Sequence, residues 1–247
     1  MKIAIRHLTR YAYAPAASRA ALRLRLYPPA FQGQTIVSWA VTVNGAAVRP
    51  SHTGAFGEGE AVWTTREAQS ELAILAAGEV ETTDAAGIVR GLHDCARPGV
   101  FLRTTPLTLA DKAIADLAKS AEASTTLETL HVLCDGVADR IVYRGNESHA
   151  GTTAAQALAH GYGVCQDHAH VFIAGARTLG VPARYVAGYM AAAQDLQETH
   201  GWAEAYVRLS CGLDAAGAAP VRGLVAPGSA EALTAEVDIA SSGGQEQ

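Results

Sequence analysis

The first third of the chain alternates apolar and polar residues with a period of two, which is typical of strands with one buried face. Leucine alternates with arginine over 22–26, and the alternation returns over 37–43, just before an Asn44-Gly45 turn signal. Further strand-like runs cover 61–65 and 72–82. The pattern predicts a β-rich N-terminal region over residues 1–83, arranged as a small antiparallel sheet or sandwich.

From residue 84 onward, apolar residues recur every three or four positions, which is the helical period. A first helix is expected after the capping signal at 108–111, and a second helical face ends near Ile141. The capping box of Thr153 and Gln156 predicts a short helix that ends at Gly161 or Gly163. A longer apolar helix is expected from about Cys165 to Leu179, with Gly180 as its stop signal.

Strand patterns return in the last quarter of the chain, over 184–190, 202–209 and 233–239, separated by a polar turn at 194–199 and a loop at 212–228. The expected class is therefore α+β, with a mixed core at 84–240 and a disordered tail at 241–247.

Composition narrows the function classes. The 247 residues carry a net charge of −5, with a pI near 6.0, which argues against nucleic acid or an anionic membrane as the main partner. No signal peptide or membrane-spanning run is evident, so the expected location is the cytoplasm. The four cysteines have no C-x-x-C spacing, which argues against a disulfide framework.

The strongest candidate chemistry lies at Gly161-Tyr-Gly-Val-Cys165-Gln-Asp-His-Ala-His170. Cys165 is expected to open a helix, where unpaired N–H groups and the helix dipole stabilise a thiolate. The same N–H groups can donate to the oxyanion that forms when an acyl group is attacked. The two glycines leave room for a substrate to approach the sulfur. Cys165 is thus the candidate nucleophile.

A cysteine nucleophile needs a base from elsewhere in the fold. His200 is the candidate, because it is expected at a strand start that can return to the helix N-terminus. Each residue alone has a simpler interpretation, Cys165 as a small core residue and His200 as a hydrogen-bonded surface histidine. The two signals together favour catalysis.

A structural zinc site is the other interpretation of this segment. The possible ligands are Cys165, Asp167, His168 and His170, with His160 and His200 nearby in sequence. Their spacing completes no tetrahedral set, so the expectation is no metal and no cofactor. Asp167 and His168 are instead expected to hydrogen-bond around the helix start and hold it in place.

Three blocks of sequence resemble the bacterial transglutaminase-like family, which is part of the papain-like cysteine protease superfamily. They are Gly163-Val-Cys165-Gln-Asp-His-Ala-His170, Ala176-Arg-x-Leu-Gly-Val-Pro-Ala-Arg-Tyr-Val-x-Gly-Tyr189 and His200-Gly-Trp-Ala-Glu-Ala-Tyr206. Tyr143 and Gly151-Thr-Thr-Ala-x-x-Ala-Leu158 also fit. His7-x-Thr-x-Tyr-x-Tyr13, Leu26-Tyr-Pro-Pro29 and Gln34 are similar to the β-rich region that often precedes this core.

The resemblance implies a papain-like core that acts on peptide or amide bonds of a peptide or protein substrate, by hydrolysis or by transfer to an amine, without a metal. It implies a Cys, His, Asp order of catalytic residues, with Cys165 and His200 in the first two positions. Tyr143 and Tyr162 are expected either to line the cleft or to pack. Water is the expected acceptor, because no lysine-binding feature is visible.

The sequence departs from the family after His200. Tyr206-Val-Arg-Leu-Ser runs directly into a block beginning at Cys211, without the strand that carries the family's aspartate. Asp214 and Asp195 are the nearest aspartates, and neither fits that position. The leading hypothesis is a cysteine peptidase, amidase or acyl transferase. The rival is a binding or assembly module that kept the cleft and lost turnover.

Overall fold

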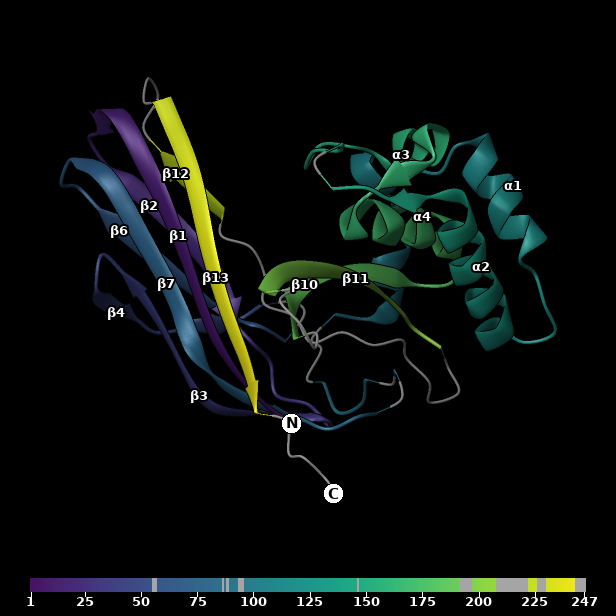
Figure 1. The fold of residues 1–247 in the computed structure, drawn as a ribbon, viewed down its shortest axis with the longest axis horizontal. Helices are drawn as coiled ribbons and strands as arrows, with labels where there is room; N and C mark the ends of the chain where they lie inside the picture. Colours follow the sequence, from purple (N-terminus) through teal and green to yellow (C-terminus); the bar gives the residue numbers. More distant parts are fainter. Residues whose placement is uncertain are drawn as a thin grey trace.

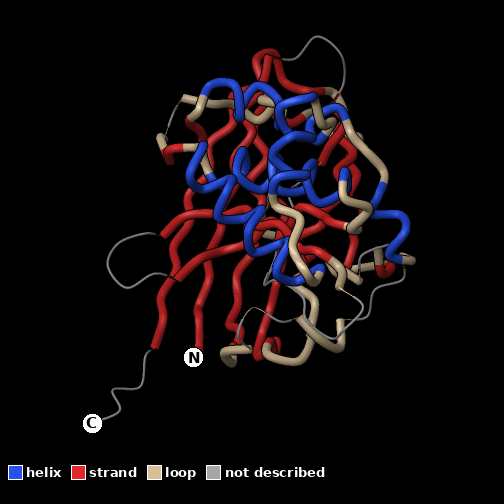
Figure 2. The backbone as a smooth tube through the Cα atoms, turned by 90° about the vertical axis from the view of Figure 1, so that its right-hand side faces the viewer, coloured by secondary structure: helices blue, strands red, loops and turns tan. Residues whose placement is uncertain are grey.

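The computed structural model of the chain describes residues 1–54, 57–85, 87, 89–92, 96–145, 147–191, 197–207, 222–225 and 230–242. One half of the molecule consists of two β-sheets, and the other half consists of helices packed around a β-hairpin (Figure 1). Seen from the helical side, the helices lie in front of the strands (Figure 2). The fold is therefore α+β, as the sequence predicts.

The β half contains a five-stranded sheet of order β13-β1-β7-β3-β4 and a four-stranded sheet of order β12-β2-β6-β5, and the pairings in both are antiparallel. The strands are β1 Lys2–Ala17, β2 Ala20–Tyr27, β3 Gln34–Val43, β4 Ala46–Val48, β5 His52–Thr53, β6 Gly59–Thr65, β7 Gln69–Thr82, β12 Arg222–Val225 and β13 Ala230–Ser242.

The two sheets form a sandwich because their apolar faces meet. Leu22 and Leu24 of β2 are buried together with Val41 of β3 and Leu72 of β7, in one apolar cluster. The arginines that alternate with these leucines point to the opposite face, as the pleat of a strand requires. The turn at Asn44-Gly45 has positive φ at both residues, which matches the twist of a tight hairpin.

The helical half surrounds α4, whose apolar residues are buried in a second cluster with those of the neighbouring helices. Its elements are η1 Pro98–Leu102, η2 Pro106–Thr108, α1 Lys112–Ser120, α2 Thr126–Arg140, β8 Val142–Tyr143, α3 Ala154–His160, β9 Tyr162–Gly163, α4 Cys165–Thr178, β10 Ala183–Ala191 and β11 Gln197–Ala205. The strands β10 and β11 form an antiparallel hairpin, and β8 and β9 pair in parallel.

Local capping signals set most helix ends. The Thr153 and Gln156 capping box begins α3, and Gly161 ends it in the left-handed conformation, as predicted. The first helix differs from the prediction, because Asp111 caps it at Ile114 N and Thr108 belongs to a 3₁₀ turn. Asp111 competes well for this role because a carboxylate oxygen accepts strongly from the free N–H groups of a first turn.

The two C-terminal strands complete the β-sandwich. β13 pairs with β1 from Ala230 opposite Ala14 to Ser242 opposite Lys2, and β12 pairs with β2. The expected division, with 84–240 as a core and 241–247 as a tail, therefore does not fit these strands. A strand whose partner lies more than two hundred positions away leaves no local trace of that pairing in the sequence.

The halves meet where the β10–β11 hairpin lies against β13. A hydrogen bond joins His7 Nδ1 of β1 to the Tyr189 hydroxyl of β10 at 2.8 Å, and the two rings meet edge to face. Burial lowers the pKa of His7 and raises that of Tyr189. Both groups are consequently held neutral, so the contact involves no buried charge.

None of the helices in the described ranges is long and apolar enough to cross a membrane.

Candidate active site

Cys165 is the first residue of α4, as the sequence predicts, and it follows Val164 at the N-cap. The chain reaches it through β9, which pairs with β8: Val142 N donates to Gly161 O and Arg144 N donates to Gly163 O, both at 2.9 Å. The sulfur is partly exposed at the positive end of a fourteen-residue helix. The fold therefore places this thiol where an anion is stabilised.

Asp167 holds the start of the helix in place. Its Oδ2 accepts a hydrogen bond from Val164 N at 2.8 Å and another from the Ser148 hydroxyl at 2.6 Å. The carboxylate is fully buried and packs so closely on Gly163 that a Cβ there would come 2.6 Å from Oδ2. The glycine before Cys165 is thus required by the carboxylate that fixes the turn.

His168 braces the same turn from the other side. Its Nδ1 lies 3.0 Å from Val164 O, and its Nε2 lies 2.8 Å from Ile141 O. A neutral imidazole has one N–H, so it donates one of these bonds at a time, and only the imidazolium donates both. The predicted hydrogen bonding of Asp167 and His168 around the helix start is confirmed.

His200 lies inside β11, opposite Gly188 of β10. The sequence places it at a strand start, but β11 already begins at Gln197, within the segment interpreted as a turn. Gln197 and Glu198 are both polar residue types, so the sequence pattern does not indicate a strand there. The His200 ring meets the Trp202 ring edge to face, with 4.6 Å between their centroids. Position 200 is therefore fixed by sheet register on one side and by the indole on the other.

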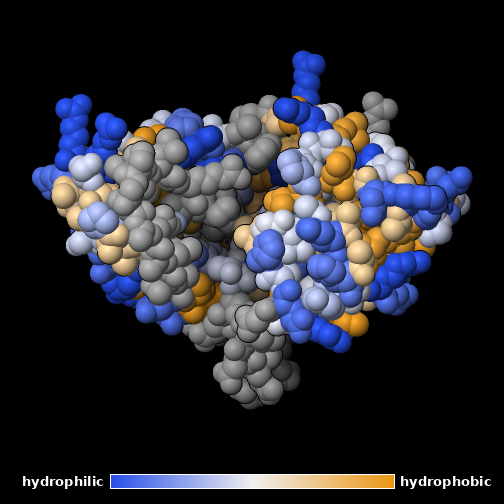
Figure 3. Space-filling model, turned by 90° about the horizontal axis from the view of Figure 1, so that it is seen from above, coloured by the Kyte–Doolittle hydropathy of each residue, from blue (hydrophilic) through white to orange (hydrophobic). Residues whose placement is uncertain are grey.

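Cys165 and His200 line the same pocket of about 430 Å³, between α2, α4 and β11. Its walls are mainly apolar and consist of Cys134, Val137, Ala138, Tyr143, Cys165, His168, Ala169, Phe172, His200, Gly201, Trp202 and Ala203. Figure 3 shows the surface hollowed between the sandwich and the helical half. A pocket of this size and character is suited to a substrate side chain or a short stretch of peptide.

The two candidate cleft tyrosines differ in position. Tyr143 lines the pocket, whereas Tyr162 stacks on His160 with 5.5 Å between the ring centroids. The Arg144 guanidinium lies 5.4 Å from the centre of the Tyr162 ring. The packing interpretation therefore applies to Tyr162, and the cleft interpretation applies to Tyr143.

Tyr185 is a neighbour of the site that the sequence did not single out. Burial, then the charges of Cys165 and Asp167, raises the pKa of Tyr185 to about 12. Its hydroxyl occupies the space where a Cβ at position 201 would lie, so only glycine fits beside His200. The sequence held one signal for this contact, the glycine that interrupts the apolar pattern of a strand.

The sequence also did not identify the part of the pocket wall that α2 contributes. Val137 and Ala138 resemble any other apolar residues of an amphipathic helix. Across the part of the chain that is described, no group of three or more His, Cys, Asp or Glu side chains is arranged to hold a metal ion. Cys95, Cys211, Asp195 and Asp214 lie outside the described residues.

A cysteine at the N-terminus of a central helix and a histidine on an adjacent β-hairpin, both lining one pocket, are typical of a papain-like arrangement. Residues 114–216 match the model of the transglutaminase-like superfamily, and residues 3–81 match that of the bacterial transglutaminase-like N-terminal region. Together the two models span most of the chain. The chain belongs to the bacterial transglutaminase-like family.

The fold also resembles solved structures. A candidate cysteine protease from Cytophaga hutchinsonii matches with a TM-score of 0.68 at 17% identity, covering 100% of this chain and 92% of that one. The periplasmic domain of TgpA from Pseudomonas aeruginosa gives 0.40 at 12% identity, covering 84% of this chain and 86% of that one. The first likeness supports the fold. No curated protein sequence matches the chain significantly.

Proposed function

We propose that the protein is a thiol-dependent hydrolase of peptide or amide bonds, with Cys165 as nucleophile and His200 as base. The observation that carries the proposal is that Cys165, at the N-terminus of α4, and His200, on β11, line one apolar pocket. A nucleophile and a base on separate rigid elements around a substrate-sized cavity are what nucleophilic catalysis requires.

In the proposed reaction, His200 takes the thiol proton and the Cys165 sulfur attacks the carbonyl carbon. The oxyanion receives hydrogen bonds from the free N–H groups at the start of α4. The C–N bond then breaks, and the amine leaves with the proton from His200. The product at this stage is a thioester on Cys165.

Water completes the cycle. His200 removes a proton from water, the resulting hydroxide attacks the thioester, and the acid is released as the sulfur regains the proton. An amine in place of water would give transfer by the same route. Water remains the proposed acceptor. The largely apolar walls of the pocket lower the local dielectric constant, which strengthens the electrostatic interactions within it.

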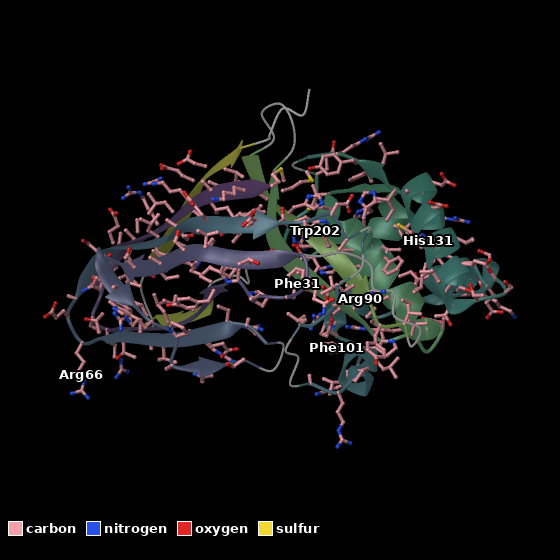
Figure 4. All side chains as sticks on the ribbon, turned by 90° about the horizontal axis from the view of Figure 1, so that it is seen from below. Phe31, Arg66, Arg90, Phe101, His131 and Trp202 are labelled. Carbon is pink, nitrogen blue, oxygen red and sulfur yellow. The ribbon has the colours of Figure 1, made fainter. Side chains whose placement is uncertain are left out.

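The experiment is hydrolysis of casein and of short fluorogenic peptides by the purified chain. Cys165→Ala should abolish hydrolysis, and His200→Ala should lower kcat by a factor on the order of 10² to 10⁴. The control is His131→Ala on α2, an exposed histidine that lies far from Trp202 in Figure 4. Full activity in Cys165→Ala would contradict the proposal.

The rival function is a binding or assembly module with a transglutaminase-like fold. Its support is the sequence after Tyr206, which lacks the family's aspartate strand. An orienting carboxylate is worth about four orders of magnitude in a serine enzyme. The rival predicts that Cys165 of the wild-type chain is alkylated, yet the chain hydrolyses no peptide or amide. The test covers about pH 5 to about pH 9, a range that includes the ordinary pKa values of histidine and cysteine.

The cytoplasm is the proposed location. Its support is that the four cysteines have no spacing typical of a disulfide framework. Reducing compartments keep cysteines as free thiols. Mass spectrometry of the untreated chain from its native cells would test this by showing the cysteines in the reduced state.

A further inference from the structure

A second cavity, of about 590 Å³, lies where the sandwich meets the β10–β11 hairpin. Its lining is Met1, Phe31, Gly33, Gln34, Thr82, Thr83, Asp84 and Ala85 from the N-terminal side, with Tyr189 and Trp202 from the hairpin. Phe31 and Trp202 both lie at this junction in Figure 4. Junctions between structural units are frequent positions for ligand sites, and the volume lies within the usual range for them.

The junction pocket shares one lining residue with the candidate active site. Trp202 lines the junction pocket and also the pocket that contains Cys165 and His200. Its ring is 4.6 Å from that of His200, centroid to centroid. A molecule that occupies both pockets would therefore pass the indole that contacts the proposed base.

The walls of the junction pocket are held by hydrogen bonds that do not involve a ligand. Gln34 is buried and donates from Nε2 to Pro29 O at 2.8 Å. Thr83 N donates to Gly33 O at 2.9 Å, which joins the turn before β3 to the end of β7. The Tyr189 hydroxyl is held by His7. Because the walls are already fixed in this way, the binding of a ligand costs little conformational entropy of the protein.

The chemistry of the walls favours a planar apolar group. Phe31, Tyr189 and Trp202 are the three aromatic residues of the lining, and Thr82 and Thr83 are polar residues beside them. Aromatic rings pair with other rings at a gain of about 0.5–1.5 kcal/mol beyond burial of their area.

We infer that the junction pocket binds an aromatic side chain of the peptide substrate, so that the N-terminal region selects a residue close to the reacting bond. This inference rests on the proposed peptide hydrolysis. Trp202 lines both pockets, so an extended peptide that reaches the junction pocket from Cys165 passes this side chain. At roughly 3.3 Å per residue of extended chain, we place the aromatic residue within about two positions of the scissile bond.

Binding tests the pocket without requiring turnover. The probe is N-acetyl-L-phenylalaninamide, titrated against the full chain by saturation-transfer NMR, with N-acetyl-L-alaninamide as the comparison. Phe31→Ala should weaken the binding of the phenylalanine probe, with a Kd about tenfold higher, because one ring contact is lost. Ala85→Phe should weaken it as well by filling the cavity. The matched control is Val62→Ala on the exposed face of β6, which should change nothing.

Turnover tests the selectivity. Fluorogenic peptides with phenylalanine within two positions of the scissile bond should have a KM about tenfold lower than those with alanine, with kcat little changed. Phe31→Ala should remove that preference while Cys165 still alkylates normally. Hydrolysis without any aromatic preference would overturn the inference and leave the proposed function intact. Binding of the probe that depends on Phe31, in a chain that hydrolyses no peptide, would refute the proposed function and support the pocket.

Discussion

Asp167 Oδ2 accepts a hydrogen bond from the backbone N–H of Val164 at 2.8 Å, directly before the candidate nucleophile. Asp167 is the third residue of α4, and its side chain accepts from the backbone N–H of the N-cap residue. This is one of the two hydrogen bonds of a capping box; in the other, the side chain of the N-cap residue accepts from the third residue's N–H. Val164 has no side-chain oxygen of its own to cap with. The start of α4 consequently depends on Asp167.

The first prediction concerns Asp167. Asp167→Ala leaves the Val164 N–H and the Ser148 hydroxyl without their acceptor, so the free energy of unfolding should fall by about 1–3 kcal/mol. Asp167→Asn should recover most of this loss, because its amide oxygen can accept both bonds. Urea denaturation measures the change. Asp116→Ala on the exposed face of α1 is the control, with an expected cost of about 0.5 kcal/mol or less. An Asp167→Ala chain as stable as wild type would contradict this account.

Gly163→Ala should also destabilise the chain. The added Cβ would come 2.6 Å from the Asp167 carboxylate, so either the turn or the carboxylate must shift. Overpacking of this kind costs about 1–3 kcal/mol. A thermal melt measures it, and Gly99→Ala is the matched control because nothing lies within 4 Å of its added Cβ. Equal melting temperatures for the two variants would refute the proposed close packing.

Thiol labelling should distinguish the two described cysteines. Iodoacetamide at neutral pH is expected to alkylate Cys165 well before Cys134, although both line the pocket. Partial burial, with the nearby Asp135 carboxylate, raises the pKa of Cys134 and keeps it in the unreactive thiol form. Peptide mapping of the alkylated chain gives the order. Faster reaction at Cys134, or at Cys95 or Cys211, would show that the nucleophile is wrongly assigned.

The pH dependence of stability should include a contribution from His7. Burial lowers the pKa of His7 in the folded chain, so the unfolded chain binds the proton more readily. The free energy of unfolding should be highest above the ordinary histidine pKa of about 6.5 and should fall as the pH drops below it. His170, whose pKa burial also lowers, acts in the same direction.

His7→Gln should therefore reduce the loss of stability between about pH 7 and pH 5 without removing it. Urea denaturation at each pH measures the slope, and His131→Gln on the exposed face of α2 is the comparison. An unchanged slope in His7→Gln would show that the contact with Tyr189 tolerates the charged form of His7.

Local chemistry explains what the sequence could predict. The Thr153 capping box, Gly161 and Gly180 act on their own immediate backbone, so the ends of α3 and α4 could be predicted from them. Cys165 was located by the same means. Alternation and strand-like runs predicted β2, β3, β6 and β7 of the sandwich, because burial on one face needs only a period of two.

The remaining features depend on partners distant in sequence. β11 extends back to Gln197 because β10 supplies hydrogen bonds to its polar residues, which their own pattern does not indicate. The wall formed by Val137 and Ala138 depends on how α2 packs, and the contact between Tyr185 and Gly201 depends on hairpin register. Such features require tertiary structure and could not be predicted from local pattern.

The pairing of β13 with β1 also bears on the order of events during synthesis. β1 is synthesised more than two hundred residues before β13, which is one of its two neighbours in the sheet. Until β13 emerges, one edge of β1 exposes unpaired backbone groups, which can recruit other nascent chains. Production at lower temperature or with a chaperone that shields strand edges should therefore raise the soluble yield. By the same reasoning, the helical half can become compact before the sandwich that precedes it in sequence.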